Sequence, residues 1–217
     1  MVQEKSSDLE RKFTVRNIRP EDIDEIVGMA KLAFGSDTIG FEREHYESHL
    51  KIFPEGQVCL EYEGNIVGSC SSMILNFEEY GDDDTIDEIC DDGFIRNHNP
   101  DGINLYGLDV IVHPNYRKMK IGGRLYEARR DICKKYNLKS IVFGGRIPNY
   151  HEYADKLTPE EYVDKVINEG FYDPVLTFQL KQGFEYRKVI ANYLPEDKES
   201  LMNATLMEWH NPEYIPQ

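Results

Sequence analysis

The chain has 217 residues, of which 40% are hydrophobic, and this size and composition fit one large domain with a core of its own. Its formal net charge of −15 arises from 40 acidic and 25 basic residues, and such a surface repels phosphate backbones, so nucleic acid is a poor candidate partner. The N-terminus lacks the apolar run of a secretory signal and no stretch of ~20 apolar residues occurs, so neither secretion nor membrane insertion is expected.

The four cysteines predict a reducing compartment. Cys59, Cys70, Cys90 and Cys133 are scattered, without a CxxC pair or a histidine at metal-ligand spacing. We therefore expect a cytoplasmic protein with neither a disulfide framework nor a metal site.

The first part of the chain is predicted to form a strand, two helices and a hairpin. Residues 1–12 are expected to be a mobile arm, and residues 13–217 a single domain. FTVRNI (13–18) is typical of a strand, and apolar residues at helical spacing follow up to Phe34 and again from Phe41 to Phe53. QVCLEYEGNIVGSCSSMIL (57–75) alternates in polarity about a turn, as a two-stranded hairpin does.

Two segments interrupt the regular pattern. Residues 76–103 are rich in acidic side chains and predict an inserted loop or short helix with a solvated face. Asp82-Asp83-Asp84 does not continue into the ligand pattern of a calcium-binding EF-hand. Residues 147–172 are longer than a simple connection from strand to helix, and we expect this second insertion to help shape a binding pocket.

The second half of the chain alternates strands and helices. NLYGLDVIVHP (104–114) predicts a strand buried on both faces, followed by a basic loop, a helix from Ile121 and the strand KSIVFGG (139–145). Thr158 with Glu161 forms a capping box that opens another helix, and a further helix is expected between residues 173 and 183. FEYRKVIANYL (184–194) and ATLMEWH (204–210) predict the last two strands.

The basic loop between residues 112 and 123 is a candidate anion site. A buried strand delivers it to a helix N-terminus, where unpaired N–H groups and the helix dipole attract an anion. Gly122 and Gly123 would let a phosphate approach the backbone, while Arg117, Lys118, Lys120 and Arg124 supply positive charge. The alternative is a tight turn in which glycine permits the bend and the basic residues face water. The loop matches neither GxGxxG nor GxxxxGK[ST], so nucleotide-binding folds of those kinds are not indicated.

The loop and its surroundings resemble a known family. Val110-x-Val112-x-Pro114-x-x-Arg117-x-x-Lys120-x-Gly122 is similar to the acetyl-CoA signature of GNAT acetyltransferases, and Gly183-Phe184 resembles that family's Gly-Phe pair. The segments YGLDVIVHPNYRKMKIGGRLYEAR, FGGRIPNYHEYADKLTPEEYV, YDPVLTFQLKQGF and NYLPEDKESL resemble the GNAT domain that often precedes a carbon-nitrogen hydrolase (nitrilase-like) domain. The chain ends near Tyr214, where such a hydrolase would begin, so we expect the acetyltransferase part standing alone.

This resemblance implies the GNAT fold: an α/β (α+β) domain with a mixed, mostly antiparallel sheet of about seven strands flanked by helices. It also implies acetyl-CoA as co-substrate. Lys120 stands where the commoner motif has glycine, which adds a cation beside the phosphates. The implied coenzyme-binding residues are Val110, Ile111, Val112, Arg117, Lys118, Met119, Lys120, Ile121, Gly122, Gly123 and Arg124.

Candidate catalytic residues follow from the chemistry of acetyl transfer. A primary amine must lose a proton before it attacks, and Asp109, in an apolar strand, is the leading candidate base; the alternative is an aspartate paired inside the fold. His113, just before a proline, is a weaker candidate. Gln179 occupies the position of the family's usual tyrosine acid and cannot protonate a thiolate, so Tyr172 or Tyr150 could serve instead.

The predicted function is transfer of acetyl from acetyl-CoA to a primary amine of a small molecule, by direct attack in a ternary complex. Tyr150, His151 and Tyr153 are the candidate residues for binding that amine. Two alternatives stay open: a non-catalytic acetyl-CoA-binding regulatory module, and a partner of a separate carbon-nitrogen hydrolase. A homodimer is also left open, whereas acetylation of protein termini is disfavoured by the long 146–173 segment.

Overall fold

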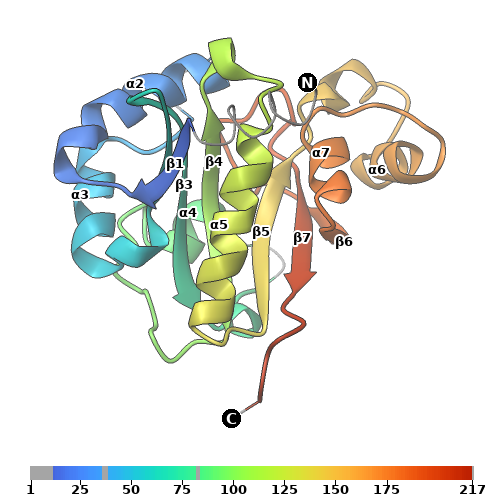
Figure 1. Ribbon diagram of the computed structural model, residues 1–217. Coiled ribbons are helices and arrows are strands. Elements are labelled where there is room, and N and C mark those ends of the chain that lie inside the picture. The colour runs from blue at the N-terminus through green and yellow to red at the C-terminus, as the bar shows by residue number, and fades with distance from the viewer. Residues whose placement is uncertain (1–11, 36–38, 82–83, 217) are drawn as a thin grey trace, which may run out of the picture.

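The computed structural model describes residues 12–35, 39–81 and 84–216, and its centre is a seven-stranded sheet in the order β1-β2-β3-β4-β5-β7-β6 (Figure 1). Only β4 and β5 are parallel, and the other neighbouring pairs are antiparallel. This confirms the predicted mixed, mostly antiparallel sheet. The strands are β1 (Phe13–Asn17), β2 (Val58–Tyr62), β3 (Asn65–Leu75), β4 (Asn104–Val112), β5 (Ser140–Arg146), β6 (Glu185–Ile190) and β7 (Ala204–His210).

Helices cover both faces of this sheet. Helix α5 packs across the middle strands on one face, with α7 beside it over β5, while α2 and α3 cover the β2–β4 part of the opposite face (Figure 1). The α-helices are α2 (Ile23–Phe34), α3 (Arg43–Ile52), α4 (Ile86–Cys90), α5 (Ile121–Lys135), α6 (Pro159–Asn168) and α7 (Leu176–Lys181). Single turns of 3-10 helix lie at η1 (Pro20–Asp22), η2 (Pro54–Gly56), η3 (Phe77–Glu79) and η4 (Pro114–Tyr116), with a longer one at η5 (Pro148–Glu152).

Local sequence signals account for most element boundaries. Thr158 caps α6 as predicted: its backbone N–H donates to the Glu161 carboxylate at 2.8 Å, and its hydroxyl accepts from the Glu161 N–H at 3.3 Å. The strand predicted over 184–194 is shorter, since β6 ends at Ile190 and a series of turns leads on to β7. The arm predicted at residues 1–12 lies outside the described residues, apart from Lys12.

The predicted insertions pack onto the domain. Within residues 76–103, the buried Ile89, Cys90 and Ile95 join the main apolar cluster, while the acidic side chains of α4 stay mostly exposed. Residues 147–172 contain η5 and α6, whose Tyr162 is fully buried. Both segments therefore contribute to the core and are more than surface loops.

No helix in the described part of the chain is long and apolar enough to cross a membrane. Over the same residues, His, Cys, Asp and Glu side chains form no cluster of three or more that could hold a metal ion.

Candidate active site

The sheet opens between β4 and β5. These strands pair only through Asn104–Tyr106 and Ser140–Val142, after which β4 continues along β3 and β5 continues along β7. Hydrogen bonding alternates in an antiparallel ladder, and the His113 N–H donates to the Val67 carbonyl at 3.0 Å. The N–H groups of Val110 and Val112 therefore point away from β3, into the opening.

A β-bulge in β4 lies beside this opening. Ser72 pairs with Gly107 and Ser71 with Asp109, so Leu108 is an extra residue in β4. Without the bulge, Gly107 and Asp109 would face the same side of the sheet. With it, Gly107 lies against α5, whereas the Asp109 side chain turns toward α3.

Asp109 is held by two hydrogen bonds at this bulge. Its Oδ2 accepts from the Tyr46 hydroxyl at 3.0 Å, and its Oδ1 accepts from the Ser71 N–H at 2.8 Å. Burial raises the pKa of the Asp109 carboxyl, although the Tyr46 hydrogen bond, the charge of Arg129 and the Ser71 N–H all act in the opposite direction. Burial, and then the charge of Asp109, keep the pKa of Tyr46 well above its ordinary value. Asp109 is thus a partly exposed carboxyl that burial makes harder to ionise.

The predicted anion loop joins β4 to α5. Lys118 and Lys120 both have left-handed backbone conformations, with φ of 69° and 60°. Lys120 is the N-cap of α5 and makes no side-chain capping hydrogen bond, and the helical ladder begins with the Arg124 N–H donating to the Lys120 carbonyl. Arg117, Lys118 and Lys120 are exposed. The first turn of a fifteen-residue helix therefore lies beside three exposed cations without a capping side chain.

Side chains of the first turn of α5 face inward. A Cβ at Gly122 would lie 2.8 Å from the Phe178 ring of α7, so glycine is needed here for helix packing. Ile121 is buried, and the guanidinium of Arg124 lies 4.4 Å from the Phe13 ring centroid. Met119 is half-buried against the core. Backbone N–H groups, together with the exposed cations, are what this turn offers to an anion.

Gln179 also lies at the opening, over the part of β5 that no longer pairs with β4. Its Oε1 is buried without a hydrogen-bond partner and packs directly on Gly145. Tyr126 of α5 lies next to it, stacked on Phe143 and Phe178. Burial raises the pKa of Tyr126 to about 12, against the opposing effects of the Arg129 charge and the Gln179 side chain.

The candidate acceptor residues are distributed around η5. Tyr150 is buried, and its hydroxyl donates to the Leu157 carbonyl at 3.1 Å. Tyr153 is partly buried between Tyr162 and Phe171. Both rings are thus largely engaged in packing.

The remaining predicted residues are more exposed. His151 Nδ1 contacts the carbonyl oxygens of Pro148 and Glu199, which ties η5 to the turn before β7. Tyr172 leaves 64% of its surface exposed, while its carbonyl accepts from the Asn149 side chain. His113 accepts from the Asn115 N–H and so caps η4.

Sequence reasoning missed the residues that surround Asp109. Tyr46 gave no signal, because a tyrosine on the buried side of an amphipathic helix is ordinarily a packing residue. Arg129 did give one: it lies four residues after Leu125, on the apolar stripe of α5, where a charged side chain is unexpected. Tyr126 was missed because its neighbour Gln179 comes from a distant helix.

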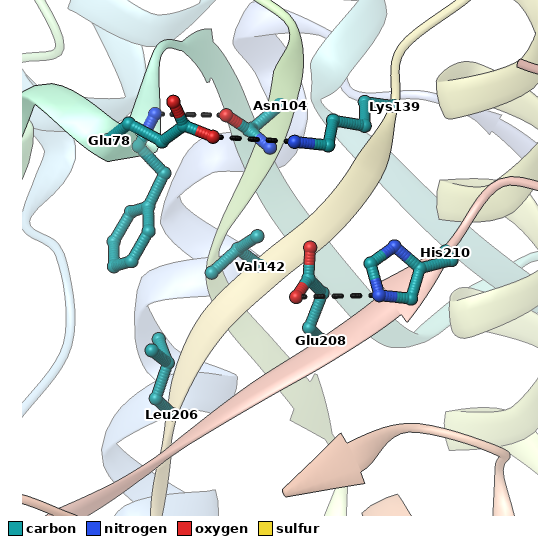
Figure 2. A pocket seen from close by; sticks show the side chains of 8 residues that line it. Glu78, Asn104, Lys139, Val142, Leu206, Glu208 and His210 are labelled. Carbon is teal, nitrogen blue, oxygen red and sulfur yellow. Dashed lines mark hydrogen bonds and ion pairs between the residues drawn. The ribbon is translucent and has the colours of Figure 1, made fainter. Parts of the chain in front are cut away.

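A separate cavity of about 200 Å³ lies away from the opening, where β4 and β5 are still paired (Figure 2). An ion pair from Lys139 to Glu78 at 3.3 Å flanks it, and His210 Nε2 lies 3.6 Å from a carboxylate oxygen of Glu208. It shares no residue with the predicted site. Its lining residues are Phe77, Glu78, Asn104, Lys139, Val142, Leu206, Glu208 and His210.

Comparison with known proteins identifies the family. The model of the acetyltransferase (GNAT) family matches residues 23–154. The chain belongs to the GNAT acetyltransferase family. It is 38% identical over 210 residues to the uncharacterized N-acetyltransferase YkwB of Bacillus subtilis (strain 168), covering 94% of this chain and 92% of that protein.

A second relative of this GNAT chain is longer. The chain is 56% identical over 209 residues to the probable hydrolase YhcX of Bacillus subtilis (strain 168), covering 96% of this chain. It spans 40% of the length of YhcX.

Solved structures share the GNAT fold. The loading GNATL domain of CurA from Lyngbya majuscula superimposes with a TM-score of 0.81 at 23% identity, covering 92% of this chain and 98% of that one. The GphF GNAT-like decarboxylase, solved in complex with isobutyryl-CoA, superimposes with a TM-score of 0.77 at 23% identity, covering 91% of this chain and 99% of that one.

Proposed function

We propose that this protein is an N-acetyltransferase that transfers acetyl from acetyl-CoA to a primary amine of a small molecule, with both substrates bound together. The observation that carries the proposal is the convergence of three features on one end of β4. These are the opening toward β5, the bulge that presents Asp109, and the uncapped first turn of α5.

The residues around the opening fit acetyl-CoA. The backbone N–H groups from Lys118 to Gly123, with the exposed Arg117, Lys118 and Lys120, would hold its pyrophosphate. The backbone from Val110 to Val112 would bind the pantetheine arm, and the buried, unpartnered Oε1 of Gln179 is an acceptor for a ligand N–H. The binding of isobutyryl-CoA by the GphF neighbour supports an acyl-CoA ligand.

When bound, acetyl-CoA supplies the acetyl group as a thioester. The N–H groups that β4 turns into the opening can donate to the acetyl carbonyl as negative charge develops there, a contact worth about 3 kcal/mol. Asp109 would accept the proton that the acceptor ammonium, with a pKa of about 10, must lose before its nitrogen attacks. Tyr46 orients the carboxylate by its hydrogen bond to Oδ2.

The leaving sulfur and the acceptor would be contacted by the segments nearest the opening. Gln179 can donate a hydrogen bond to the thiolate through its amide, and Tyr172 stays the candidate acid because its phenol is exposed. His151 and Tyr153 are proposed to contact the amine. Tyr150 is proposed to support them, since its hydroxyl is bonded to Leu157.

The test combines binding and turnover. Calorimetry should detect acetyl-CoA binding to the wild-type protein, and thiol release from acetyl-CoA should depend on the added amine across a panel of small primary amines. Lys118→Glu with Lys120→Glu should weaken binding about tenfold by placing anions beside the phosphates. Lys135→Glu, at the other end of α5, is the matched control and should leave binding unchanged.

A second candidate is a regulatory module that binds acetyl-CoA without turnover, or that partners a separate carbon-nitrogen hydrolase. Gln179, in the position of the usual acid, favours it, and the name of the YhcX relative supports a link to a hydrolase. Binding of acetyl-CoA without thiol release for any amine would select this alternative. For either function we infer a cytoplasmic location, supported by four buried, free cysteines.

A further inference from the structure

Arg129 is a buried arginine in the middle of α5. Only 1% of its surface is exposed, although arginine is rarely buried without a carboxylate partner. Its Nε donates to the Ser72 hydroxyl at 3.0 Å, and its Nη2 donates to the carbonyl oxygens of Ser71 at 2.8 Å and Asp109 at 2.6 Å. All three acceptors belong to β3 and β4, the two strands that pair at the bulge.

The guanidinium adds hydrogen bonds at the bulge between β3 and β4. At the bulge, the Ser71 N–H donates to the Asp109 side chain. The carbonyl oxygens of Ser71 and Asp109 both accept from Arg129. Because these acceptors come from both strands at the bulge, the three bonds of one guanidinium stabilise the bulged register.

The residue opposite Arg129 is small enough to admit it. A Cβ at Gly107 would lie 2.6 Å from Nη1 of Arg129, closer than two such atoms can approach. Glycine in the middle of a buried strand weakens that strand, and here it leaves room for the guanidinium. Gly107 and Arg129 therefore form a matched pair across the interface between β4 and α5.

We propose that Arg129 is a positioning residue: it holds the bulge of β4 so that the Asp109 carboxylate faces Tyr46 at the open end of the strand. Through Asp109 it would set the rate of proton removal without touching either substrate. The catalytic part of this inference rests on the proposed function, whereas the structural part stands on the three hydrogen bonds.

The charge of Arg129 acts on the same carboxyl. The titratable or charged groups around Asp109 are Tyr46 from α3, Arg129 from α5 and Cys70 from β3. Helix α2, which also packs on β4, contributes apolar side chains to this face, and its Glu25 carboxylate accepts from the Ile66 N–H at the start of β3. Arg129 is the one cation in this set, so its removal should raise the pKa of Asp109 further above its ordinary value.

Three variants separate position from charge. Arg129→Met removes both, Arg129→Lys keeps a cation that cannot span the three acceptors, and Gly107→Ala keeps the arginine but displaces it. We expect kcat to fall about tenfold or more in all three, with KM for acetyl-CoA within about twofold of wild type. The acidic limb of the kcat/KM profile should move to higher pH in Arg129→Met and much less in Arg129→Lys.

Arg130→Met is the matched control from the same helix. Arg130 donates to the Gln182 carbonyl and lies over the rings of Phe184 and Trp209, on the β7 side of α5. Its loss should lower the melting temperature while leaving the pH profile in place. Equal pH shifts in Arg130→Met and Arg129→Met would show that the effect reflects general destabilisation and would overturn the proposal.

A titration of Asp109 that requires no catalysis tests the structural part of this inference independently of the proposed function. In protein labelled with ¹³C at aspartate carboxyl carbons, Asp109, assigned by Asp109→Asn, should titrate at higher pH in Arg129→Met than in wild type. If Arg129→Met does not fold, Gly107→Ala carries the same measurement. An unchanged titration with unchanged kcat overturns the positioning role, whereas a shifted titration in a protein without amine-dependent thiol release overturns only the proposed function.

Discussion

The two halves of β4 differ although they form one continuous strand. From Asn104 to Tyr106 the strand is paired on both edges and fully buried, and the Asn104 side chain links two neighbouring segments. From Gly107 to Val112 it is paired on one edge only, is bulged, and contains a carboxyl group whose pKa is raised. The closed half has a strand on each edge, whereas the open half has one edge without a strand partner, and the proposed site lies along that edge.

This contrast shows how a sheet can hold a site without losing its core. In the proposed function, the backbone groups of β4 that do not pair with β5 bind the ligand, and Arg129 holds the bulge beside them. Polar residues in the two halves should therefore respond differently to substitution.

The largest expected effect is in the open half. Asp109→Asn should lower kcat/KM roughly a thousandfold, because a general base is lost, while acetyl-CoA affinity stays within about twofold. The folded-state pKa of Asp109 lies above its unfolded value, so its contribution to stability is present at low pH and is lost as pH rises through the folded pKa. The neutral variant should therefore melt no lower than wild type at pH 7; a clearly lower melting temperature would point to a structural aspartate.

The helix that covers the open half should be sensitive to acid. His49 of α3 is fully buried with Nε2 bonded to the Gly93 carbonyl, and burial lowers its pKa to about 4. Because the folded state favours the neutral imidazole, the contribution of His49 to the free energy of unfolding is fully present above pH 6.5. That contribution decreases by about 3 kcal/mol in total as the pH falls toward 4.

His98 acts in the same direction, because burial also lowers its pKa. His49→Gln should therefore reduce the pH dependence of unfolding free energy, measured by denaturant titration between pH 7 and 4.5, without removing all of it. An unchanged dependence would mean that burial does not lower the pKa of His49 in the folded protein.

Substitutions in the closed half should change the stability of the protein and leave its rate of catalysis unchanged. Asn104 accepts from the Phe77 N–H at 2.9 Å and donates to the Ser140 hydroxyl at 2.9 Å while buried. Asn104→Ala leaves both groups unpaired and should lower the free energy of unfolding by about 2 kcal/mol. Initial rates of thiol release at saturating substrates should match wild type at 20 °C, and a fall in kcat would erase the distinction between the halves.

The smallest effect is expected at the loop that follows the open half. Lys120 has a φ of 60°, which costs a residue with a side chain about 1 kcal/mol or more relative to glycine. Lys120→Gly should raise the melting temperature slightly and weaken acetyl-CoA binding slightly, since one cation is lost. A lower melting temperature would show that the lysine side chain stabilises the loop.

The fold was largely predictable because its signals are local. Alternation identified the β2–β3 hairpin, and the Thr158 capping box marked the start of α6. The resemblance to GNAT enzymes also implied the sheet that the structure confirms. The roles predicted for Asp109, Gln179 and the loop residues stay predictions.

The surroundings of Asp109 were not predictable, because they depend on which distant residues meet. One extra residue in β4 decides whether Asp109 faces α5 or α3, and residue alternation alone does not indicate a bulge. Tyr46 lies 63 positions from Asp109 in the chain. Arg129 was visible as a charge on an apolar stripe, but its partners are mostly backbone carbonyls, which leave no mark in a sequence.

The sequence contains one tryptophan, and its place in the sheet makes it a useful fluorescent reporter. Trp209 of β7 pairs with Ile141, and the Arg130 guanidinium lies 5.3 Å from its ring. In the strand order, β5 separates its strand from the bulged β4. Its emission can therefore follow unfolding of variants at Asp109, Arg129 or Lys120, none of which replaces a residue in contact with the indole ring.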